Sequence, residues 1–256
     1  MPFCADIFYR EYRENGSGFS YPVILIHGAG SDLFGWPVPI RRLPGRHIIA
    51  LDLPGHGQSE GPVHHSLSAL RTHLHRFILE LGFAHTILVG YSLGGLIALD
   101  YAGHFPEDIK GLSLIAFGTR SRLPEGLMDR LGHPREAEQV KDEFNRIFFH
   151  QEFPHSMRQK IMKPFHAVKP GILKADFSIG LNYQLEANQQ NISCPVQFIS
   201  GSQDQIATPS SVRQLAYMFP GADLHFIPSA GHMVLFEKTD QVISLLSGFL
   251  AAITAP

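Results

Sequence analysis

The sequence has few of the features that mark a secreted, disulfide-bonded or membrane-spanning protein. Its 256 residues include only two cysteines, Cys4 and Cys194, which lie far apart and form no disulfide framework. No apolar run approaches the roughly 18 residues that a membrane-spanning helix needs. The first ten residues reach charged Asp6 and Arg10 without the apolar stretch of a signal peptide. We therefore expect a cytoplasmic protein that has no membrane partner.

An excess of charge of one sign is also lacking. The chain has 21 lysine and arginine residues against 23 aspartate and glutamate residues, a formal net charge of −2. Nucleic-acid-binding domains concentrate positive charge on one face, so no nucleic-acid partner is expected. Hydrophobic residues make up 44% of the chain, which is long enough to bury a sizeable core.

What the chain does have is an alternation of short β-branched runs with amphipathic stretches. Strands are expected at 23–26, 47–51, 86–89, 109–116, 196–199 and 223–227. Helices are expected at 66–81, 93–102 and 234–252, and another is expected to open at an N-capping Thr208 followed by Pro209. This alternation is typical of βαβ units around a mostly parallel sheet.

The alternation is interrupted between residues 119 and 191. No clear strand is found there, and several helix-like stretches carry aromatic and methionine side chains, which could line an apolar pocket or form the core of the insertion. One doubly wound α/β core, formed by residues 1–118 and 192–256, explains the pattern better than two independent domains. The insertion, 119–191, is then a helical cap on that core.

A glycine-serine-glycine motif, Gly90-Tyr91-Ser92-Leu93-Gly94, directly follows the strand expected at 86–89 and opens an apolar helix. On such a sharp turn the serine hydroxyl is raised above the edge of the sheet. Larger side chains two residues before and after it would collide with the backbone. We predict that Ser92 is a nucleophile; the alternative is a glycine-rich turn that only packs the helix on the strand.

With three other motifs, this turn resembles the α/β-hydrolase family. The others are His-Gly-Ala-Gly at 27–30, Asp-Leu-Pro-Gly-His-Gly-Gln-Ser at 52–59, and Gly-His at 231–232. Their order and spacing are similar to those of the family over nearly the whole chain, and the insertion falls where the family has its cap. The resemblance implies the α/β-hydrolase fold.

The resemblance also indicates which histidine activates the serine, whose neutral hydroxyl is a poor nucleophile. Of the 15 histidines, only His232 lies in a glycine-flanked loop after the last expected strand, where the family has its base. A structural loop histidine is the alternative. His27 belongs to the first turn motif, and we expect it to position the backbone there. The remaining histidines form no credible set of metal ligands, so neither a metal nor a cofactor is expected.

A carboxylate is needed to hold the tautomer of the base and to stabilise the imidazolium that forms. Asp204 follows one expected strand and precedes a helix, which gives the chain order Ser, Asp, His that the fold requires. A turn or helix-capping aspartate is the alternative interpretation. Asp52 also follows a strand but precedes the nucleophile, and we expect it to brace its own turn.

The resemblance further implies an oxyanion hole formed by the backbone amides of Ala29 and Leu93. Trp36 stands nine residues beyond His27, where the family often has a tryptophan that lines the pocket, although core packing explains it equally well. Tyr91, beside the nucleophile, is the second candidate substrate-binding residue.

Particular residues disfavour several subclasses of the family. Haloalkane dehalogenases and epoxide hydrolases on this fold have aspartate where this chain has Ser92, and carbon–carbon bond hydrolases usually have asparagine where Pro37 follows the tryptophan. The remaining prediction is hydrolysis of a small-molecule carboxylic ester through an acyl-enzyme intermediate. A receptor or signalling protein that retains the triad, and a perhydrolase or cofactor-free haloperoxidase, are the alternatives.

Overall fold

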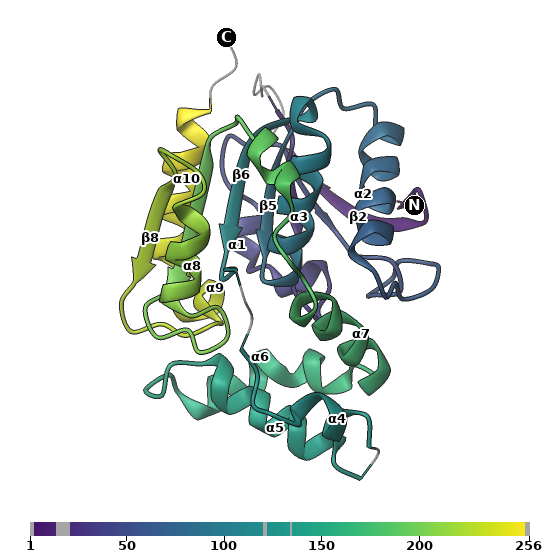
Figure 1. Cartoon of the computed structure of the whole chain (residues 1–256), viewed down its shortest axis with the longest axis vertical. Coiled ribbons are helices and arrows are strands. Elements are labelled where there is room, and N and C mark those ends of the chain that lie inside the picture. Colours follow the sequence, from purple (N-terminus) through teal and green to yellow (C-terminus); the bar gives the residue numbers. More distant parts are fainter. Residues whose placement is uncertain (1–2, 14–20, 120–121, 134, 254–256) are drawn as a thin grey trace.

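The computed structural model describes residues 3–13, 21–119, 122–133 and 135–253. In this part of the chain eight strands form one sheet with helices on both faces, and further helices lie beyond one end of it (Figure 1). The strands are β1 (Phe3–Cys4), β2 (Ile7–Tyr12), β3 (Val23–Ile26), β4 (Ile48–Leu51), β5 (Thr86–Tyr91), β6 (Ile109–Ile115), β7 (Val196–Gly201) and β8 (Asp223–Ile227).

The strand order in the sheet is β1-β2-β4-β3-β5-β6-β7-β8. β2 pairs antiparallel with both β1 and β4, and each of the other neighbouring pairs is parallel. Parallel strands place their carboxyl ends at one edge of the sheet, so the loops that follow β3, β5, β7 and β8 open on the same side. The predicted mostly parallel, doubly wound α/β-hydrolase fold is confirmed.

Alternate residues of the central strand β3 contribute to two apolar cores, one on each face of the sheet. Val23 and Leu25 belong to one core, Ile24 and Ile26 to the other, and all four side chains are fully buried. Successive side chains of a strand point to opposite faces, so a continuous apolar run is what a strand covered on both faces requires. Helices α1 (Val38–Arg41), α9 (Val234–Glu237) and α10 (Thr239–Ala252) cover the first core, and α2 (Leu67–Glu80), α3 (Leu93–His104) and α8 (Pro209–Ala216) the second.

Side-chain caps start two of the helices at the expected residues. The Ser66 hydroxyl accepts a hydrogen bond from the backbone N–H of Ala69 at the start of α2, and the Thr208 hydroxyl accepts one from Ser211 at the start of α8. Pro209 occupies the first turn of α8, where its missing N–H costs no helical hydrogen bond. Three short 3-10 helices, η1 (Leu33–Gly35), η2 (Pro106–Asp108) and η3 (Ala187–Asn191), lie in connecting segments.

The prediction of one closing helix over 234–252 is wrong. The chain forms α9 and α10 instead, and Lys238 separates them with non-helical backbone angles, φ −140° and ψ 46°. Glu237, the last residue of α9, directs its carboxylate to two backbone amides outside the helix, those of Gly231 and His150. The Thr239 hydroxyl donates to the Leu235 carbonyl across the break (2.7 Å). The apolar pattern of the sequence continues through Lys238, so the pattern alone does not show that the helix is broken there.

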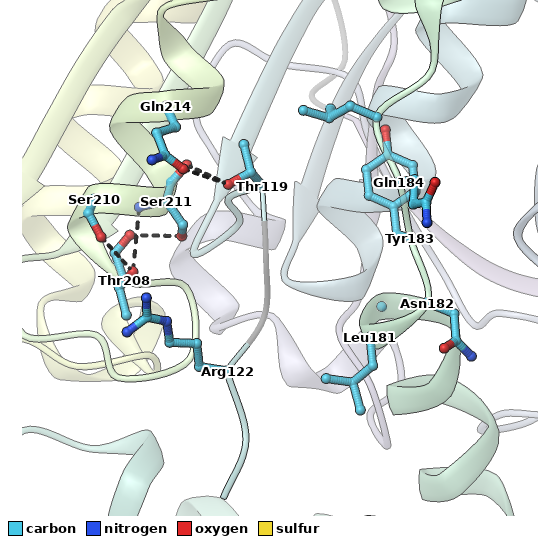
Figure 2. Close-up of a pocket in the computed structure, with 12 residues that line it drawn as sticks. Thr119, Arg122, Leu181, Asn182, Tyr183, Gln184, Thr208, Ser210, Ser211 and Gln214 are labelled. Carbon is cyan, nitrogen blue, oxygen red and sulfur yellow. Dashed lines mark hydrogen bonds between the residues drawn. The ribbon is translucent and has the colours of Figure 1, made fainter. Parts of the chain in front are cut away.

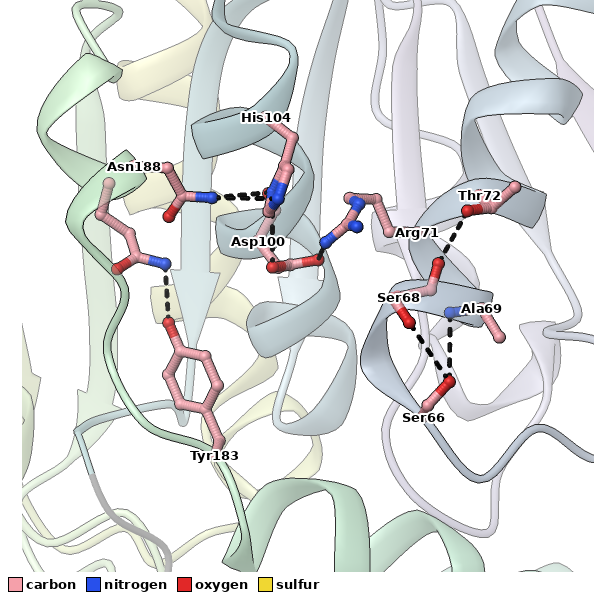
Figure 3. A network of polar contacts seen from close by, with 10 residues as sticks. Ser66, Ser68, Ala69, Arg71, Thr72, Asp100, His104, Tyr183 and Asn188 are labelled. Carbon is pink, nitrogen blue, oxygen red and sulfur yellow. Dashed lines mark hydrogen bonds and ion pairs between the residues drawn. The ribbon is translucent and has the colours of Figure 1, made fainter.

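A polar network joins α2 and α3 to the segment that returns from the insertion to β7 (Figure 3). Asp100 of α3 is fully buried, and its Oδ2 accepts a hydrogen bond from Arg71 Nη1 of α2 (2.8 Å). One turn further along α3, His104 Nδ1 lies 2.8 Å from the side-chain amide nitrogen of Asn188. The contact of Asn188 with His104 holds the return segment against α3, the helix that follows Ser92.

Four α-helices in the described residues between β6 and β7 lie beyond the carboxyl ends of the strands (Figure 1). They have a core of their own, in which Phe144 stacks on Phe177 with ring centroids 4.7 Å apart. These cap helices are α4 (Leu127–Leu131), α5 (Ala137–Phe148), α6 (His155–Ala167) and α7 (Pro170–Leu181). The division of the chain into a core and a cap at 119–191 stays a prediction, and its first boundary adjoins residues 120 and 121, which lie outside the described residues.

None of the helices in the described residues has the length and apolar character needed to cross a bilayer. The longest, α2 and α10, have 14 residues each, whereas a spanning helix needs about 20. The cytoplasmic location stays a prediction.

Candidate active site

Three side chains from three different loops meet at the carboxyl edge of the sheet. Ser92 follows β5, Asp204 follows β7, and His232 follows β8. His232 Nε2 lies 3.0 Å from Ser92 Oγ, and its Nδ1 lies 2.9 Å from Asp204 Oδ2. The structure thus brings the predicted nucleophile, base and acid together in one chain of two hydrogen bonds.

The turn that carries Ser92 is sterically crowded. Ser92 has φ 53° and ψ −113°, a conformation that is rare for a residue with a side chain. A Cβ atom on Gly90 would lie 2.2 Å from the carbonyl oxygen of Gly94, and one on Gly94 would lie 2.0 Å from that of Ile26. The Ser92 N–H donates to the Ile115 carbonyl (2.9 Å). Only glycine therefore fits at the positions two residues before and two residues after this serine.

Asp204 is almost completely buried, and its two carboxylate oxygens have different partners. Oδ1 accepts hydrogen bonds from the backbone amides of Ile206 (2.8 Å) and Ala207 (2.9 Å), while Oδ2 faces the imidazole of His232. An ionised carboxylate only accepts hydrogen bonds, so the proton of a neutral His232 resides on Nδ1. Its Nε2 is then free to accept the proton of Ser92 Oγ.

The backbone N–H groups of Ala29 and Leu93, which the resemblance implies as the oxyanion hole, lie beside Ser92. Leu93 is the first residue of α3, where N–H groups have no acceptor within the helix. In the described part of the chain, no hydrogen bond uses the N–H of Ala29 or of Leu93. Both residues line, together with Ser92, a small cavity of about 20 Å³, which has room for about one oxygen-sized atom.

His27 and Asp52, in the two turn motifs that precede Ser92, form hydrogen bonds with the backbone of their loops, as the sequence analysis predicts. His27 is fully buried; its Nδ1–H donates to the Gly28 carbonyl (2.8 Å) and its Nε2 accepts from the Leu53 amide (2.9 Å). Burial, followed by the nearby charge of His56, lowers the pKa of His27 to about 3, so this ring is neutral. The Asp52 carboxylate accepts hydrogen bonds from two backbone amides.

A cavity of about 490 Å³ opens above Ser92 and His232. Tyr91 lies on its wall, and the Tyr91 hydroxyl donates to the carbonyl of His232 (3.0 Å). Burial raises the pKa of Tyr91 well above its ordinary value, so this hydroxyl stays a neutral donor. The cap helices α5, α6 and α7 contribute apolar side chains to the wall, namely Phe148, Ile161, Met162, Phe165 and Phe177. The aromatic residues of the insertion therefore both form the core of the cap and line the cavity.

The prediction that Trp36 lines the pocket is wrong. Trp36 is 1% exposed, does not line the cavity, and belongs to the core that α1 covers. Its ring packs edge-on against Tyr91, with centroids 6.3 Å apart. Core packing, the other explanation of this tryptophan, is what the structure shows.

A larger cavity, of about 1000 Å³, lies between α8 and the segment that follows α7. Figure 2 shows its polar walls, with Thr208, Ser211 and Gln214 on one side and Asn182 and Gln184 on the other. The residues that line it include neither the serine nor the histidine of the hydrogen-bonded set. The hydrogen-bonded serine and histidine instead line the smaller cavity of about 490 Å³.

A partly buried carboxylate that the sequence analysis missed, that of Glu237, holds the loop of His232. Glu237 Oε1 accepts from the N–H of Gly231 (3.0 Å), and its Oε2 accepts from the N–H of His150 after α5 (2.9 Å). Burial raises the pKa of Glu237 despite these two hydrogen bonds. Glu237 lies five residues after the base, and nothing in its sequence neighbourhood distinguishes it from a surface glutamate.

We expect Glu237→Ala to destabilise the protein. Each of the two N–H groups loses its acceptor, at about 1–3 kcal/mol for a buried group, which predicts a decrease in Tm of roughly 5–20 °C at this size. Thermal unfolding followed by circular dichroism measures it, with the exposed Glu125→Ala as the matched control. Equal Tm values for the two variants would contradict the role given to Glu237.

Comparisons with known proteins show the family and the fold of the chain. The sequence profile of the Alpha/beta hydrolase family matches residues 23–245. Monoacylglycerol lipase ABHD6 of Bos taurus is 26% identical over 262 residues, which cover 92% of this chain and 77% of that protein. Lipase 1 of Psychrobacter immobilis is 26% identical over 257 residues, covering 95% and 81%.

Solved structures share the fold at low sequence identity. An esterase from Thermogutta terrifontis superposes with a TM-score of 0.82 at 22% identity, covering 97% of this chain and 94% of its own. An enol-lactonase from Burkholderia xenovorans LB400 superposes with a TM-score of 0.84 at 22% identity, covering 96% of each chain. Since the family profile spans most of the sequence, the chain belongs to the alpha/beta hydrolase family.

Proposed function

We propose that the chain hydrolyses carboxylic esters, with Ser92 as nucleophile, His232 as general base and Asp204 as the acid that orients it. The observation that carries this proposal is the pair of hydrogen bonds from Ser92 Oγ through the imidazole to Asp204. The relatives named above are lipases, an esterase and a lactonase, which all act on ester bonds.

The first half of the reaction acylates the serine. His232 Nε2 takes the proton of Ser92 Oγ while the oxygen attacks the ester carbonyl carbon. The carbonyl oxygen becomes an oxyanion, and the N–H groups of Ala29 and Leu93 stabilise it by about 3 kcal/mol each. The intermediate then collapses, and His232 Nε2 gives its proton to the departing alcohol.

The second half releases the acid and restores the enzyme. A water molecule attacks the acyl-enzyme carbonyl, and His232 Nε2 takes its proton. A second oxyanion forms at the same two amides. Its collapse breaks the bond to Ser92 Oγ, which recovers its proton from the imidazole. Asp204 stays ionised throughout and stabilises the imidazolium in both halves.

The cavity above Ser92 indicates the kind of ester. A cavity of about 490 Å³ whose lining includes five phenylalanine, one isoleucine and two methionine residues fits an apolar group of small to medium size. We therefore expect turnover to pass through a maximum at an intermediate acyl length.

The test is a panel of p-nitrophenyl esters from acetate to palmitate, combined with a fluorophosphonate probe and mass spectrometry of the labelled peptide. We expect turnover, a single adduct on Ser92, and loss of turnover in proportion to labelling. Labelling without turnover of any ester would favour a receptor that retains the triad. Peracid formation from peroxide that outpaces hydrolysis would favour a perhydrolase.

A further inference from the structure

A buried carboxylate of the cap helix α7, that of Asp176, contacts the loop that carries Ala29. Asp176 is 2% exposed, and its Oδ2 accepts a hydrogen bond from the backbone N–H of Gly30 (2.8 Å). The same oxygen lies 2.9 Å from His56 Nε2. Asp176 also lines the small cavity that Ala29, Ser92 and Leu93 share. A side chain of the cap thus lies at the proposed oxyanion hole.

The loop at Gly30 has little room to move under α7. Gly30 has φ +60°, and a Cβ atom there would lie 2.2 Å from Leu173 Cδ2 of that helix. The hydrogen bond from the Gly30 N–H to Asp176 fixes the orientation of the peptide plane between Ala29 and Gly30. The N–H of Ala29, one residue earlier, is then the amide of this loop that has no acceptor. The contact therefore selects which amide of this loop is available.

His56 balances the charge of Asp176. Its two ring nitrogens both have acceptors, because Nδ1 lies 3.1 Å from the Pro54 carbonyl and Nε2 faces Asp176. A ring that donates from both nitrogens is an imidazolium. Burial alone lowers the pKa of His56, but the hydrogen bond and charge of Asp176 outweigh it and raise this pKa, with a smaller contribution from Asp52. The nearby His27 ring, 5.3 Å away between centroids, is neutral.

The positive charge of His56 beside Asp176 matters because, in the proposed reaction, an oxyanion forms next to these two side chains. An isolated carboxylate beside the hole would oppose the developing negative charge, whereas a carboxylate paired with an imidazolium leaves the local charge near zero. His56 also fixes the position of Asp176 Oδ2, since one oxygen accepts both hydrogen bonds.

From these contacts, and on the basis of the proposed function, we infer that Asp176 is a positioning residue that shapes the oxyanion hole from the cap, with His56 as its charge partner. The Ala29 amide then has its catalytic orientation only while α7 is seated on the loop. Catalysis is thereby coupled to closure of the cap.

The kinetic test compares Asp176→Ala and Asp176→Asn with the exposed cap variant Asp142→Ala. A displaced oxyanion donor affects the transition state more than the bound substrate. We therefore expect Asp176→Ala to lower kcat by about 10- to 100-fold with KM changed less than about threefold. A trifluoromethyl ketone, which forms a tetrahedral adduct with Ser92, should lose affinity by the same factor as kcat/KM.

Asp176→Asn retains an oxygen for the Gly30 N–H and is expected to fall between wild type and Asp176→Ala. It keeps the test decisive if the alanine variant does not fold. A folded Asp176 variant whose kcat equals that of Asp142→Ala, or whose KM alone changes, would overturn the inference.

A second measurement does not require activity. Hydrogen–deuterium exchange of the peptide that spans residues 28–33 should be at least ~10-fold faster in Asp176→Ala than in Asp142→Ala, because Gly30 loses its acceptor, and Asp176→Asn, in which the acceptor is uncharged, should lie between the two. Unchanged exchange would refute the contact whatever the kinetics show. Absence of ester turnover in the wild type, with faster exchange in the variants, would refute the proposed function and leave the contact established.

Discussion

Ser92→Ala is expected to lower kcat for the best ester of the panel by at least ~10³-fold while the protein stays folded. The hydroxyl is the atom that becomes acylated, and no other hydroxyl or thiol lies within hydrogen-bond distance of His232 Nε2 among the described residues. Alanine also removes no contact that the turn needs, because the turn is held by the backbone bond to Ile115 and by the glycines at 90 and 94.

Stopped assays with the purified variant measure the loss, and the exposed Ser202→Ala serves as the matched serine control. The fluorophosphonate adduct should disappear in Ser92→Ala and persist in Ser202→Ala. Turnover above about 1% of wild type in a correctly folded Ser92→Ala would mean that another group performs the chemistry.

The turn that holds Ser92 could be predicted because its requirements are local. A glycine two residues before and after Ser92 is a steric necessity of one turn, and the strand and helix on either side are visible as apolar runs. His232 and Asp204 required more, because neither is distinguished by its neighbours. Each follows a strand of a parallel sheet, and the carboxyl ends of such strands share one edge.

Other features could not be predicted, since they depend on where distant segments meet. The spacing of Trp36 from His27 fits a tryptophan that lines the pocket as well as one that packs in the core. Only the packing of α1 on the sheet decides that Trp36 belongs to the core. Glu237 accepts a hydrogen bond from the N–H of His150, 87 residues away in the sequence, and Asp176 accepts one from the N–H of Gly30, 146 residues away. A lone carboxylate in a helical pattern is most often on a solvated face, so periodicity gives no warning of either.

The two antiparallel strands at the edge of the sheet were also outside the expected elements. β1 has two residues, and β2 carries Arg10 and Glu11 within its six, so neither has the apolar alternation of a half-buried strand. These two strands join the sheet through backbone hydrogen bonds, since β2 pairs with β4. Short, charged strands are common at sheet edges, where they limit pairing with other chains.

Asp204→Asn is expected to lower kcat by about 10³- to 10⁴-fold with little change in Tm. The reason follows from the two partners of this side chain. The backbone amides of Ile206 and Ala207 both require an oxygen at the Oδ1 position. In the variant the amide oxygen occupies that position, and the NH₂ group is therefore directed at His232 Nδ1. As a donor it requires an acceptor there, so the imidazole proton moves to Nε2. A protonated Nε2 cannot accept the proton of Ser92.

The hydrogen-bond count is the same in Asp204→Asn as in the wild type, which separates this explanation from a loss of structure. Thermal unfolding should change by no more than a few degrees, and the exposed Asp142→Asn should retain both activity and Tm. Labelling of Ser92 by the fluorophosphonate should slow by a factor similar to that of kcat, because both reactions need the same proton acceptor. A variant that turns over within tenfold of wild type would show that the amide can reorient, and that the two backbone N–H groups do not determine the tautomer of the base.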